Sequence, residues 1–460
     1  MRELRISGFH YKQLKDHLFP GDGKEAVSIA LCGRHEWDNK QTLLVHKLVN
    51  IPYEDCKIRE HDLVKWSTNI LIPHLIDASK KGWGIVKVHS HPNGYANFSE
   101  TDNTSDKELF DSVFGWMNNE NSHGSIIMLP DGSLFGRFIE SDLRFEQMNK
   151  ISLSGDDIRY WYSSSHNYKS AGFNIRTEQT FGKGTLQLLK GLKVGVIGCS
   201  GTGSPTIEQL VRLGVGSLVL IDPDKVEEKN LNRILNTTIS DVKESRYKVD
   251  VLSEIINKIG LGTEVKSYKN NLYDNFDAIH ELASCDIIFG CVDSVDGRHL
   301  INQIANFYLI PYFDLGVKVI ADGKGSVDQI CGTINYLQPR GSSLMSRGLY
   351  SNEELRAAGL YRVNPKEYET QKKSGYIVNV NVDSPAVISI NMQTASIAVN
   401  EFLARIHPFR YDPNSEFAIT RFSITDAYVQ REDDGIPDEY LVKYVGRGDI
   451  IPLLNMPELS

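Results

Sequence analysis

Two histidines and one aspartate form a candidate metal site in the first third of the chain. The apolar run 84–88 predicts a buried strand that continues directly into His89-Ser90-His91. Histidines at positions i and i+2 of a strand project to the same face, so both imidazoles can reach one ion. The loop that follows can return Asp102 as a third ligand and leave a fourth position for water. This is the arrangement of a catalytic zinc site, in which water ionises near neutral pH. The alternative is a surface His-x-His pair beside an unrelated aspartate.

A strand, a glycine-rich turn and a helix follow one another between residues 194 and 213. The apolar run 194–197 is bounded by glycine, which is typical of a buried parallel strand. The turn contains Gly198, Gly201 and Gly203, with a serine where the usual second glycine stands. Such a turn holds phosphate groups on backbone N–H groups at a helix N-terminus. The glycine run is a weak signal alone, but in this context it indicates a nucleotide site.

Charged side chains follow the next predicted strand, 217–221. Asp222 ends this strand and can accept hydrogen bonds from ribose hydroxyls. Further polar residues stand beyond it: Asp224, Asn230, Arg233, Lys248 and, after a later apolar strand, Asp293. An oxidoreductase has no need for a cationic cluster just past the ribose acid. A protein that holds a triphosphate does need one, together with a carboxylate for Mg²⁺.

The elements that must position these residues alternate along the second part of the chain. Strands are expected over 194–197, 217–221, 263–268, 285–292 and 311–319, with helices over 206–213, 243–259 and 297–308. This alternation predicts a doubly wound parallel sheet, which binds ligands at the carboxyl ends of its strands. Gly198, Asp222 and Asp293 all stand at such ends. A further strand is expected over 325–337, a long polar loop over 340–373 and a helix over 384–405.

The first 148 residues predict a separate α/β domain. Strands are expected over 26–32, 42–49, 84–88 and 132–139, and a helix over 61–81. The polar, serine-rich stretch 149–170 predicts a linker, which leaves 171–460 as the second domain.

Composition excludes several classes of function. The 460 residues carry a formal charge of −9 and no basic tract, so nucleic acid is not an expected partner. The sequence has neither a membrane-length apolar run nor a signal peptide at its polar start, so we expect a cytoplasmic protein without membrane contacts. The six cysteines form no C-x-x-C pair, which argues against a disulfide framework and against a four-cysteine zinc site.

The second domain resembles the ThiF/MoeB family, the adenylating domain shared with ubiquitin-activating enzymes. The resemblance is carried by the glycine turn, by Asp222-Pro-Asp224-Lys-Val, by Asn230-Leu-Asn-Arg233, by Lys248 and by Gly290-Cys-Val-Asp293. It implies ATP and Mg²⁺ as cofactors, with Asp222 on the ribose, Arg233 and Lys248 on the phosphates, and Asp293 close to magnesium. Asp224 and Asn230 are weaker members of this set, and Asp224 could merely cap the next turn.

The same resemblance implies a homodimer and a crossover loop within 340–373 that passes over the tail of a carrier protein. An arginine in the lead-in to the first strand reaches the phosphates in this family, often from the other subunit. Arg176 is the candidate here, and a solvated helix arginine is the alternative.

The sequence also departs from this family, many of whose members have a structural zinc site with two C-x-x-C pairs and a crossover-loop cysteine. Ser343 and Ser346 have the spacing of the first pair, and no cysteine follows Cys331. We therefore expect no structural zinc in this domain. Cys331 is expected to be a strand core residue and Cys199 to point away from the phosphates. The reaction should then stop at the acyl-adenylate, which passes to an external amine or to a partner's thiol.

The first domain resembles the JAMM (MPN, JAB) metalloproteases, which include deubiquitinating isopeptidases, on the pattern H-S-H-x7-S-x-x-D. The resemblance implies zinc bound by His89, His91 and Asp102. It also implies that Ser99 hydrogen-bonds the reacting carbonyl oxygen and that a glutamate on an early strand is the general base. Glu25, just before Ala-Val-Ser-Ile-Ala-Leu-Cys-Gly, fits this role best, and Glu36 is the competing candidate.

The two resemblances together imply a bifunctional enzyme of a kind found as bacterial fusions. The zinc site would cleave the amide after the C-terminal glycine of a ubiquitin-like protein, and the nucleotide site would activate the glycine carboxylate as an acyl-adenylate. Three alternatives stay open: adenylation of a peptide, activation of a ThiS/MoaD-like sulfur-carrier protein, or a binding scaffold with one or both sites inactive.

Overall fold

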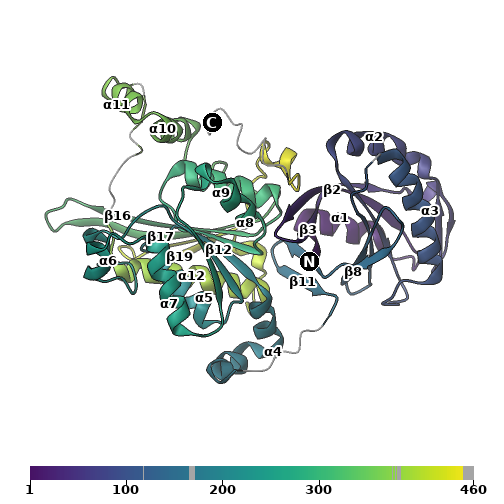
Figure 1. Cartoon of the computed structure of the whole chain (residues 1–460), viewed down its shortest axis with the longest axis horizontal. Coiled ribbons are helices and arrows are strands. Elements are labelled where there is room, and N and C mark those ends of the chain that lie inside the picture. The colour runs from purple at the N-terminus through teal and green to yellow at the C-terminus, as the bar shows by residue number, and fades with distance from the viewer. Residues whose placement is uncertain (118, 165–170, 376, 379, 381–384, 449–460) are drawn as a thin grey trace. The chain divides into compact units, whose positions relative to one another are not determined.

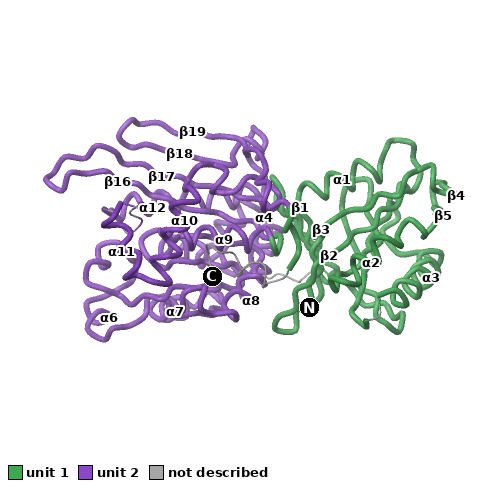
Figure 2. The backbone as a smooth tube through the Cα atoms, turned by 90° about the horizontal axis from the view of Figure 1, so that it is seen from above, with its two compact units in different colours: residues 1–165, 307–309, 443–449 green, residues 166–306, 310–442, 450–460 purple. Residues whose placement is uncertain are grey.

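The computed structural model describes all residues of the chain except 118, 165–170, 376, 379, 381–384 and 449–460. It divides into two compact units, drawn in green and purple in Figure 2. Unit 1 contains residues 1–165, 307–309 and 443–449, and unit 2 contains the remainder. No helix among the described residues has the length and apolar character needed to cross a bilayer.

The described part of unit 1 is built on a mixed sheet of nine strands in the order β11-β10-β1-β3-β2-β6-β7-β8-β9. These strands are β1 (Arg2–Ser7), β2 (Val27–Trp37), β3 (Lys40–Asn50), β6 (Gly84–Ser90), β7 (His123–Met128), β8 (Leu134–Ile139), β9 (Phe145–Gln147), β10 (Lys150–Ser154) and β11 (Ile158–Tyr162). Figure 1 labels β2, β3, β8 and β11 of this sheet. The short strands β4 (Cys56–Arg59) and β5 (Val64–Trp66) pair separately. The helices are α1 (Gly8–Leu18), α2 (Ile72–Lys81) and α3 (Glu100–Met117).

Apolar side chains cover both faces of this sheet, as the alternation along β6 illustrates. Val86 belongs to the core that contains Leu14 of α1, whereas Ile85 belongs to the core that contains Phe110 of α3. Side chains alternate across a strand, so His89 lies on the same face as Ile85, toward α3. The sheet therefore presents the first predicted metal ligand to the helix that carries Asp102.

Two of the sequence expectations for this unit are wrong. The helix expected over 61–81 begins only at Ile72, because Pro73 occupies its first turn while Val64 and Trp66 form a strand. A linker was expected over 149–170, but the strands β10 and β11 lie between residues 150 and 162. The polar residues of this segment suggested a linker, but Lys150 is buried because it forms an ion pair with Glu3 at 3.0 Å. The rest of that linker, 165–170, lies outside the described residues.

Unit 2 has an eight-stranded sheet in its described part, in the order β14-β13-β12-β15-β16-β17-β18-β19. Its strands are β12 (Lys193–Ile197), β13 (Ser217–Ile221), β14 (Glu264–Tyr268), β15 (Ile287–Gly290), β16 (Tyr312–Ala321), β17 (Val327–Leu337), β18 (Ile419–Ser423) and β19 (Tyr428–Glu432). The strands from β14 to β16 pair in parallel, which confirms a Rossmann-like parallel sheet, and β17 to β19 extend it with antiparallel pairs that the sequence had only partly indicated.

The helices of unit 2 are α4 (Ile175–Gly191), α5 (Gly203–Arg212), α6 (Ile239–Lys243), α7 (Lys248–Ile259), α8 (Phe276–Ala283), α9 (Val295–Phe307), α10 (Asn352–Val363), α11 (Pro365–Lys373) and α12 (Ile388–Ile406). The last of these packs against α5, β16 and β17. The prediction of a long loop over 340–373 is wrong, since α10 and α11 form much of this segment. Ser351 and Glu354 cap α10 reciprocally, and Asn364 caps α11, so polar residues start these helices.

Candidate functional site

Three side chains meet just beyond the carboxyl end of β6 in unit 1. The Nε2 atoms of His89 and His91 lie 3.2 Å apart. Asp102 Oδ1 is 2.9 Å from His89 Nε2, and its Oδ2 is 3.5 Å from His91 Nε2. Ligands bound to a tetrahedral zinc ion lie about 3.3 Å from one another. Among the described residues this is the one group of three or more such side chains close enough to share an ion, and its spacing fits zinc.

Backbone and helix-capping contacts hold these ligands. The Nδ1–H of His91 donates to the carbonyl oxygen of Tyr95 at 2.7 Å, which leaves the lone pair of Nε2 directed at the cluster. Asp102 lies in the first turn of α3, where its Oδ2 accepts from the backbone N–H and the hydroxyl of Ser99, each at 2.7 Å. The Asp102 N–H in turn donates to Ser99 Oγ at 3.1 Å. The Ser-x-x-Asp spacing is thus also a reciprocal helix cap.

The charges in the cluster are set by burial and by mutual hydrogen bonds. Burial lowers the pKa of His89 to about 4, so this imidazole is neutral at pH 7. Burial opposes protonation of His91 as well, but its contacts with Asp102, the Tyr95 carbonyl and Glu25 together outweigh this and raise its pKa. Burial would raise the pKa of Asp102, whereas its contacts with both histidines hold that pKa well below the usual range. The carboxylate is therefore ionised, which is the form that binds a metal.

A buried ion cluster fixes α3 against the sheet one turn beyond Asp102. Asp106 is fully buried, pairs with Lys87 of β6, and accepts from Arg137 Nη2 of β8 at 2.7 Å. Lys87 shares the face of β6 with His89. Asp106 was not predicted from the sequence, where its signal was its position four residues after Asp102 on a helix.

We expect Asp106→Ala to lower the free energy of unfolding of unit 1 by about 3–5 kcal/mol, because the change leaves two buried cations without their shared carboxylate. Intrinsic tryptophan fluorescence during urea titration measures this selectively, because the five tryptophans all lie within residues 37–161. Asp111→Ala, on the exposed face of the same helix, is the control and should leave the midpoint unchanged. Equal midpoints for the two variants would contradict a structural role for Asp106.

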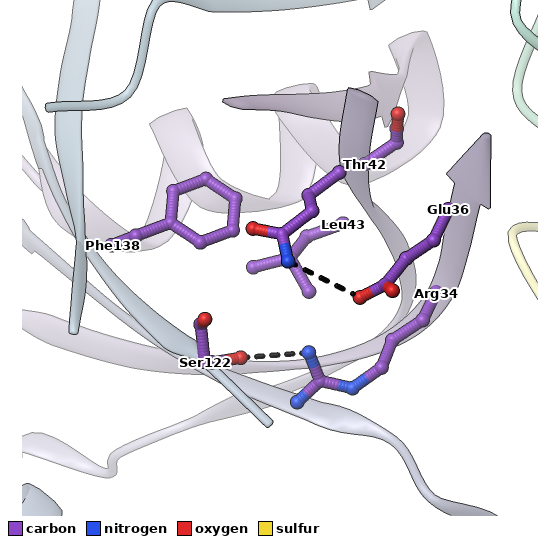
Figure 3. Close-up of a pocket in the computed structure, with 7 residues that line it drawn as sticks. Arg34, Glu36, Thr42, Leu43, Ser122 and Phe138 are labelled. Atoms are coloured by element: carbon purple, nitrogen blue, oxygen red, sulfur yellow. Dashed lines mark hydrogen bonds between the residues drawn. The ribbon is translucent and has the colours of Figure 1, made fainter. Parts of the chain in front are cut away.

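The structure separates the two candidate general bases. Glu25 directly precedes β2, and its Oε1 lies 4.0 Å from His91 Nε2. Burial raises the pKa of Glu25 to about 7. Glu36 lies near the other end of β2, roughly 30 Å away at about 3.3 Å per residue. It lies within the strand and lines a separate pocket with Arg34, Gln41, Ser122 and Phe138 (Figure 3).

In unit 2 the glycine turn follows β12. Gly198 has a φ of +87°, which an L side chain rarely adopts. A Cβ on Gly203 would overlap the carbonyl oxygen of Gly198, so α5 can begin this close to the strand only with glycine. The turn thus has the tight bend and the close helix–strand packing of a dinucleotide-type phosphate loop.

Asp222, Asp224 and Lys248 form an ion cluster beside this turn. Asp222 is 4 % exposed, and its Oδ2 accepts from the Cys199 N–H at 2.7 Å. Burial raises its pKa. Lys248 Nζ, at the start of α7, lies 2.7 Å from Asp224 Oδ2 and 3.6 Å from Asp222 Oδ1. This geometry places Asp224 in the charge cluster rather than in a purely capping role.

Three further predicted residues lie around the carboxyl ends of the strands. Arg233 is partly exposed, and its Cδ would lie 3.2 Å from a Cβ built on Gly201. Asn230 is buried and uses its Oδ1 to accept from the Glu227 N–H at 3.0 Å, so it caps a short helical turn. Asp293 follows β15 with an exposed carboxylate.

The segment that carries Asp293 is held by Arg298, which the sequence analysis did not single out. Its Nε donates to the carbonyl oxygen of Val292 at 3.0 Å, and its Nη2 donates to that of Leu315 at 3.2 Å. The same side chain lies 3.4 Å from the buried Asp314. These contacts fix the end of β15 relative to β16.

Arg176 is not brought to the nucleotide site of its own chain. It is exposed in the first turn of α4, where Nη1 donates to Gln179 Oε1 at 3.3 Å. The neighbouring Asn174 packs near Gly214, which follows α5 at the end opposite the glycine turn. A role for Arg176 at this site therefore requires a second copy of the chain.

The surroundings of the two cysteines near the site, Cys199 and Cys291, disfavour the thiolate. Cys199 is fully buried, and burial raises its pKa well above the ordinary range. Burial also raises the pKa of Cys291 to about 12. Cys331 lies in β17, as expected for a strand residue, but it is partly exposed rather than buried in the core.

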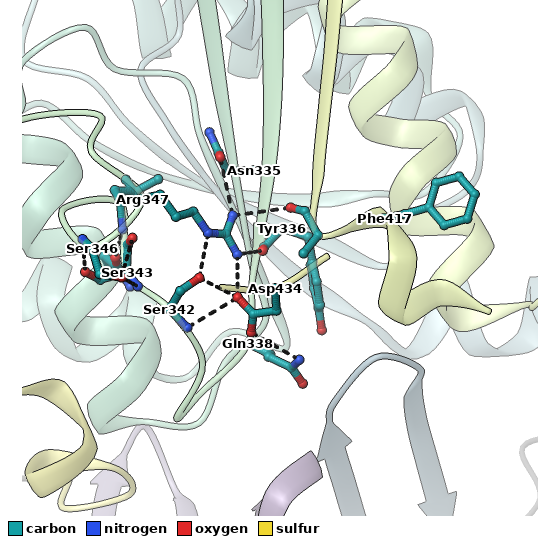
Figure 4. A network of polar contacts seen from close by, with 12 residues as sticks. Asn335, Tyr336, Gln338, Ser342, Ser343, Ser346, Arg347, Phe417 and Asp434 are labelled. Atoms are coloured by element: carbon teal, nitrogen blue, oxygen red, sulfur yellow. Dashed lines mark hydrogen bonds and ion pairs between the residues drawn. The ribbon is translucent and has the colours of Figure 1, made fainter. Parts of the chain in front are cut away.

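The serine pair at 343 and 346 belongs to a polar network (Figure 4). Ser343 Oγ donates to Asp438 Oδ2 at 2.5 Å, and the Ser343 N–H donates to Ser346 Oγ at 2.9 Å. Next to it, Asp434 accepts from Ser342 Oγ and pairs with Arg347 Nη2 at 3.0 Å. The serine hydroxyls are thus engaged by protein groups, and hydrogen bonds tie 342–347 to the segment after β19.

Unit 2 has a Rossmann-like nucleotide-binding fold. Its parallel sheet carries a glycine turn after the central strand β12 and an aspartate after the neighbouring strand β13. The model of the ThiF family matches residues 174–409, just over half of the chain, and the chain belongs to this family.

Curated relatives match a shorter stretch. Ubiquitin-like modifier-activating enzyme 5 of Drosophila ananassae is 31 % identical over 157 residues, which is 32 % of this chain and 37 % of that protein. Adenylyltransferase and sulfurtransferase UBA4 of Meyerozyma guilliermondii is 35 % identical over 149 residues, 32 % of this chain and 34 % of that protein. The chain thus spans about a third of the length of the curated relatives it matches. A crystal structure of E. coli MccB with MccA-N7isoASN covers 59 % of this chain and 74 % of its own, at 18 % identity and a TM-score of 0.45.

Proposed function

We propose that unit 2 is an ATP-dependent adenylyltransferase that activates the C-terminal carboxylate of a ubiquitin-like or sulfur-carrier protein. The observation that carries this proposal is the convergence of the glycine turn, Asp222, Lys248, Arg233 and Asp293 at the carboxyl ends of parallel strands. Membership of the ThiF family and the names of the curated relatives support it.

In the proposed reaction, an oxygen of the substrate carboxylate attacks the α-phosphorus of ATP. The bond to the bridging oxygen of the β-phosphate breaks, and pyrophosphate leaves. Lys248 exchanges its contact with Asp224 for a phosphate oxygen, and Arg233 supplies a second cation to the transferring group. Asp222 would accept from the ribose hydroxyls, and Asp293 would hold Mg²⁺.

The acyl-adenylate is the proposed end product on this chain. A thioester needs a thiolate, and the pKa is raised for the thiols of the buried Cys199 and of the partly exposed Cys291. The adenylate then passes to an external amine or to the thiol of a partner. We also propose a homodimer, because Arg176 lies away from the site of its own chain and could serve only the partner's nucleotide.

We further propose that unit 1 is a zinc peptidase of the JAMM type, which cleaves after the C-terminal glycine of the same substrate class. The carrying observation is the set of distances among His89, His91 and Asp102, which fits one tetrahedral ion with its fourth position open. A zinc ion in this position would act as a Lewis acid that lowers the pKa of water.

The residues of the chain then have separate roles in hydrolysis. Glu25 accepts a proton from the attacking water and later returns it to the leaving amine, for which a pKa near 7 is well suited. Ser99 donates to the carbonyl oxygen of the substrate as negative charge develops on it, and must release Asp102 Oδ2 to do so. Cleavage would expose the carboxylate that unit 2 activates.

We expect Glu25→Gln to retain zinc and to lose at least a hundredfold in cleavage, because the amide cannot accept the proton. The variant should therefore trap its substrate, and an uncleaved carrier or conjugate should copurify with Glu25→Gln but not with the wild type. Glu36→Gln is the matched control, since Glu36 lies at the other end of β2. Normal cleavage by Glu25→Gln together with loss in Glu36→Gln would reverse the assignment.

A further inference from the structure

One buried amide beside the glycine turn has no role in the reaction described above. Asn391 lies in the first turn of α12, and its side chain is 4 % exposed. A Cβ built on Gly201 would overlap the Asn391 Nδ2, while the Arg233 Cδ would lie 3.2 Å away on the same side of the turn. The amide is therefore directed at the middle of the glycine turn, next to a cation.

This amide differs from three other buried asparagines of unit 2. Asn335 donates to Asp314 Oδ2 at 3.3 Å, Asn306 to the carbonyl of Leu441 at 2.6 Å, and Asn414 to that of Ala404 at 2.9 Å. No hydrogen bond joins the Asn391 side chain to another residue in the described part of the chain. The Asn391 amide is not one of the fully buried polar atoms that lack a partner, so it keeps a small contact with solvent at the turn. A ligand that binds at the turn would replace this solvent and accept a hydrogen bond from Nδ2.

We infer that the Asn391 side chain is a phosphate-binding residue, which donates to a phosphate oxygen of the nucleotide at Gly201 beside Arg233. The inference rests on the proposed function, because it requires ATP at this turn. A glycine turn at a helix N-terminus typically binds phosphate oxygens, which are hydrogen-bond acceptors. The donor comes from α12, which packs directly on α5. In this proposal α12 contributes a donor to the site.

A purely structural role for Asn391, as a packing residue against Gly201, predicts a different result. The test measures binding of Mg-ATP and of adenosine to the full chain by calorimetry. Asn391→Ala should weaken Mg-ATP about tenfold or more, as expected for one hydrogen bond to a charged group. Asn391→Asp keeps the shape and adds a negative charge, so its loss should be larger and should grow at low salt. Both variants should bind adenosine, which has no phosphate, as tightly as the wild type does.

Asn400→Asp is the matched control, since Asn400 is exposed on the same helix, and it should bind both ligands normally. Unchanged Mg-ATP affinity in both Asn391 variants would overturn the inference while leaving the nucleotide site intact. Equal losses for adenosine and Mg-ATP would assign Asn391 to packing. A wild-type chain that binds no Mg-ATP would instead refute the proposed adenylyltransferase, and this inference with it.

Discussion

Replacing Asp102 with alanine should reduce the zinc content of the purified protein from about one ion per chain to a small fraction of that. The wild-type cluster offers three protein ligands, and a site left with His89 and His91 alone binds zinc far more weakly. The loss should appear in elemental analysis of protein dialysed against zinc-buffered solution. It should also appear as easier removal of the remaining metal by a chelator.

The control for this experiment is Ser99→Ala. Asp102→Ala removes the reciprocal cap of α3 together with a metal ligand, and either effect could release zinc. Ser99→Ala removes the cap, at a cost of about 1 kcal/mol, but keeps all three ligands. We expect it to retain zinc. Undiminished zinc in Asp102→Ala would show that the three ligands do not form the site.

Asp293→Ala should lower ATP–pyrophosphate exchange by two to three orders of magnitude, measured with Mg²⁺ and with the carrier recovered by copurification. The exposed carboxylate after β15 is held in place by the backbone contacts of Arg298, so the variant should lose the magnesium ligand without losing the fold. An effect of about a hundred- to a thousandfold is typical when one electrostatic partner of the reacting group is removed.

Asp328→Ala provides a comparison at an exposed carboxylate of β17 and should exchange normally. Exchange within a few-fold of the wild type in Asp293→Ala would exclude Asp293 from the reaction. Tighter binding of NADH than of Mg-ATP by the wild type would count against the entire nucleotide assignment.

Residues close in sequence were the ones that could be predicted. His89 and His91 share a strand face because side chains alternate, and the Ser99 and Asp102 spacing fits the first turn of a helix. Gly198, Asp222 and Asp293 could be predicted from the ends of the expected strands, because parallel strands bring their carboxyl ends to one edge of a sheet. In these cases the geometry of one strand, of one helix turn or of a regular parallel sheet is enough to determine which side chains meet.

Contacts between distant segments could not be predicted in this way. Asp106 pairs with Arg137 of another strand, and Asn391 approaches Gly201 from a helix almost two hundred residues later. The residues next to Asn391 in the sequence form an apolar helix, and they do not indicate which turn its side chain will contact. The prediction of a linker over 150–162 was wrong for a related reason. Lys150 is compatible with a buried strand only because Glu3 lies on β1 and pairs with it.

The polar network around Arg347 has a consequence for how the two units respond to conditions in the cell. It ties the segment after β19 to residues 342–347 through serine hydroxyls, carboxylates and one guanidinium, in a region that follows the last cysteine of the sequence. Neither oxidants that attack thiols nor a shortage of metal should loosen these bonds. Under the proposed function, zinc starvation would stop cleavage in unit 1, whereas unit 2 would keep its shape and activate only those carboxylates that are already exposed.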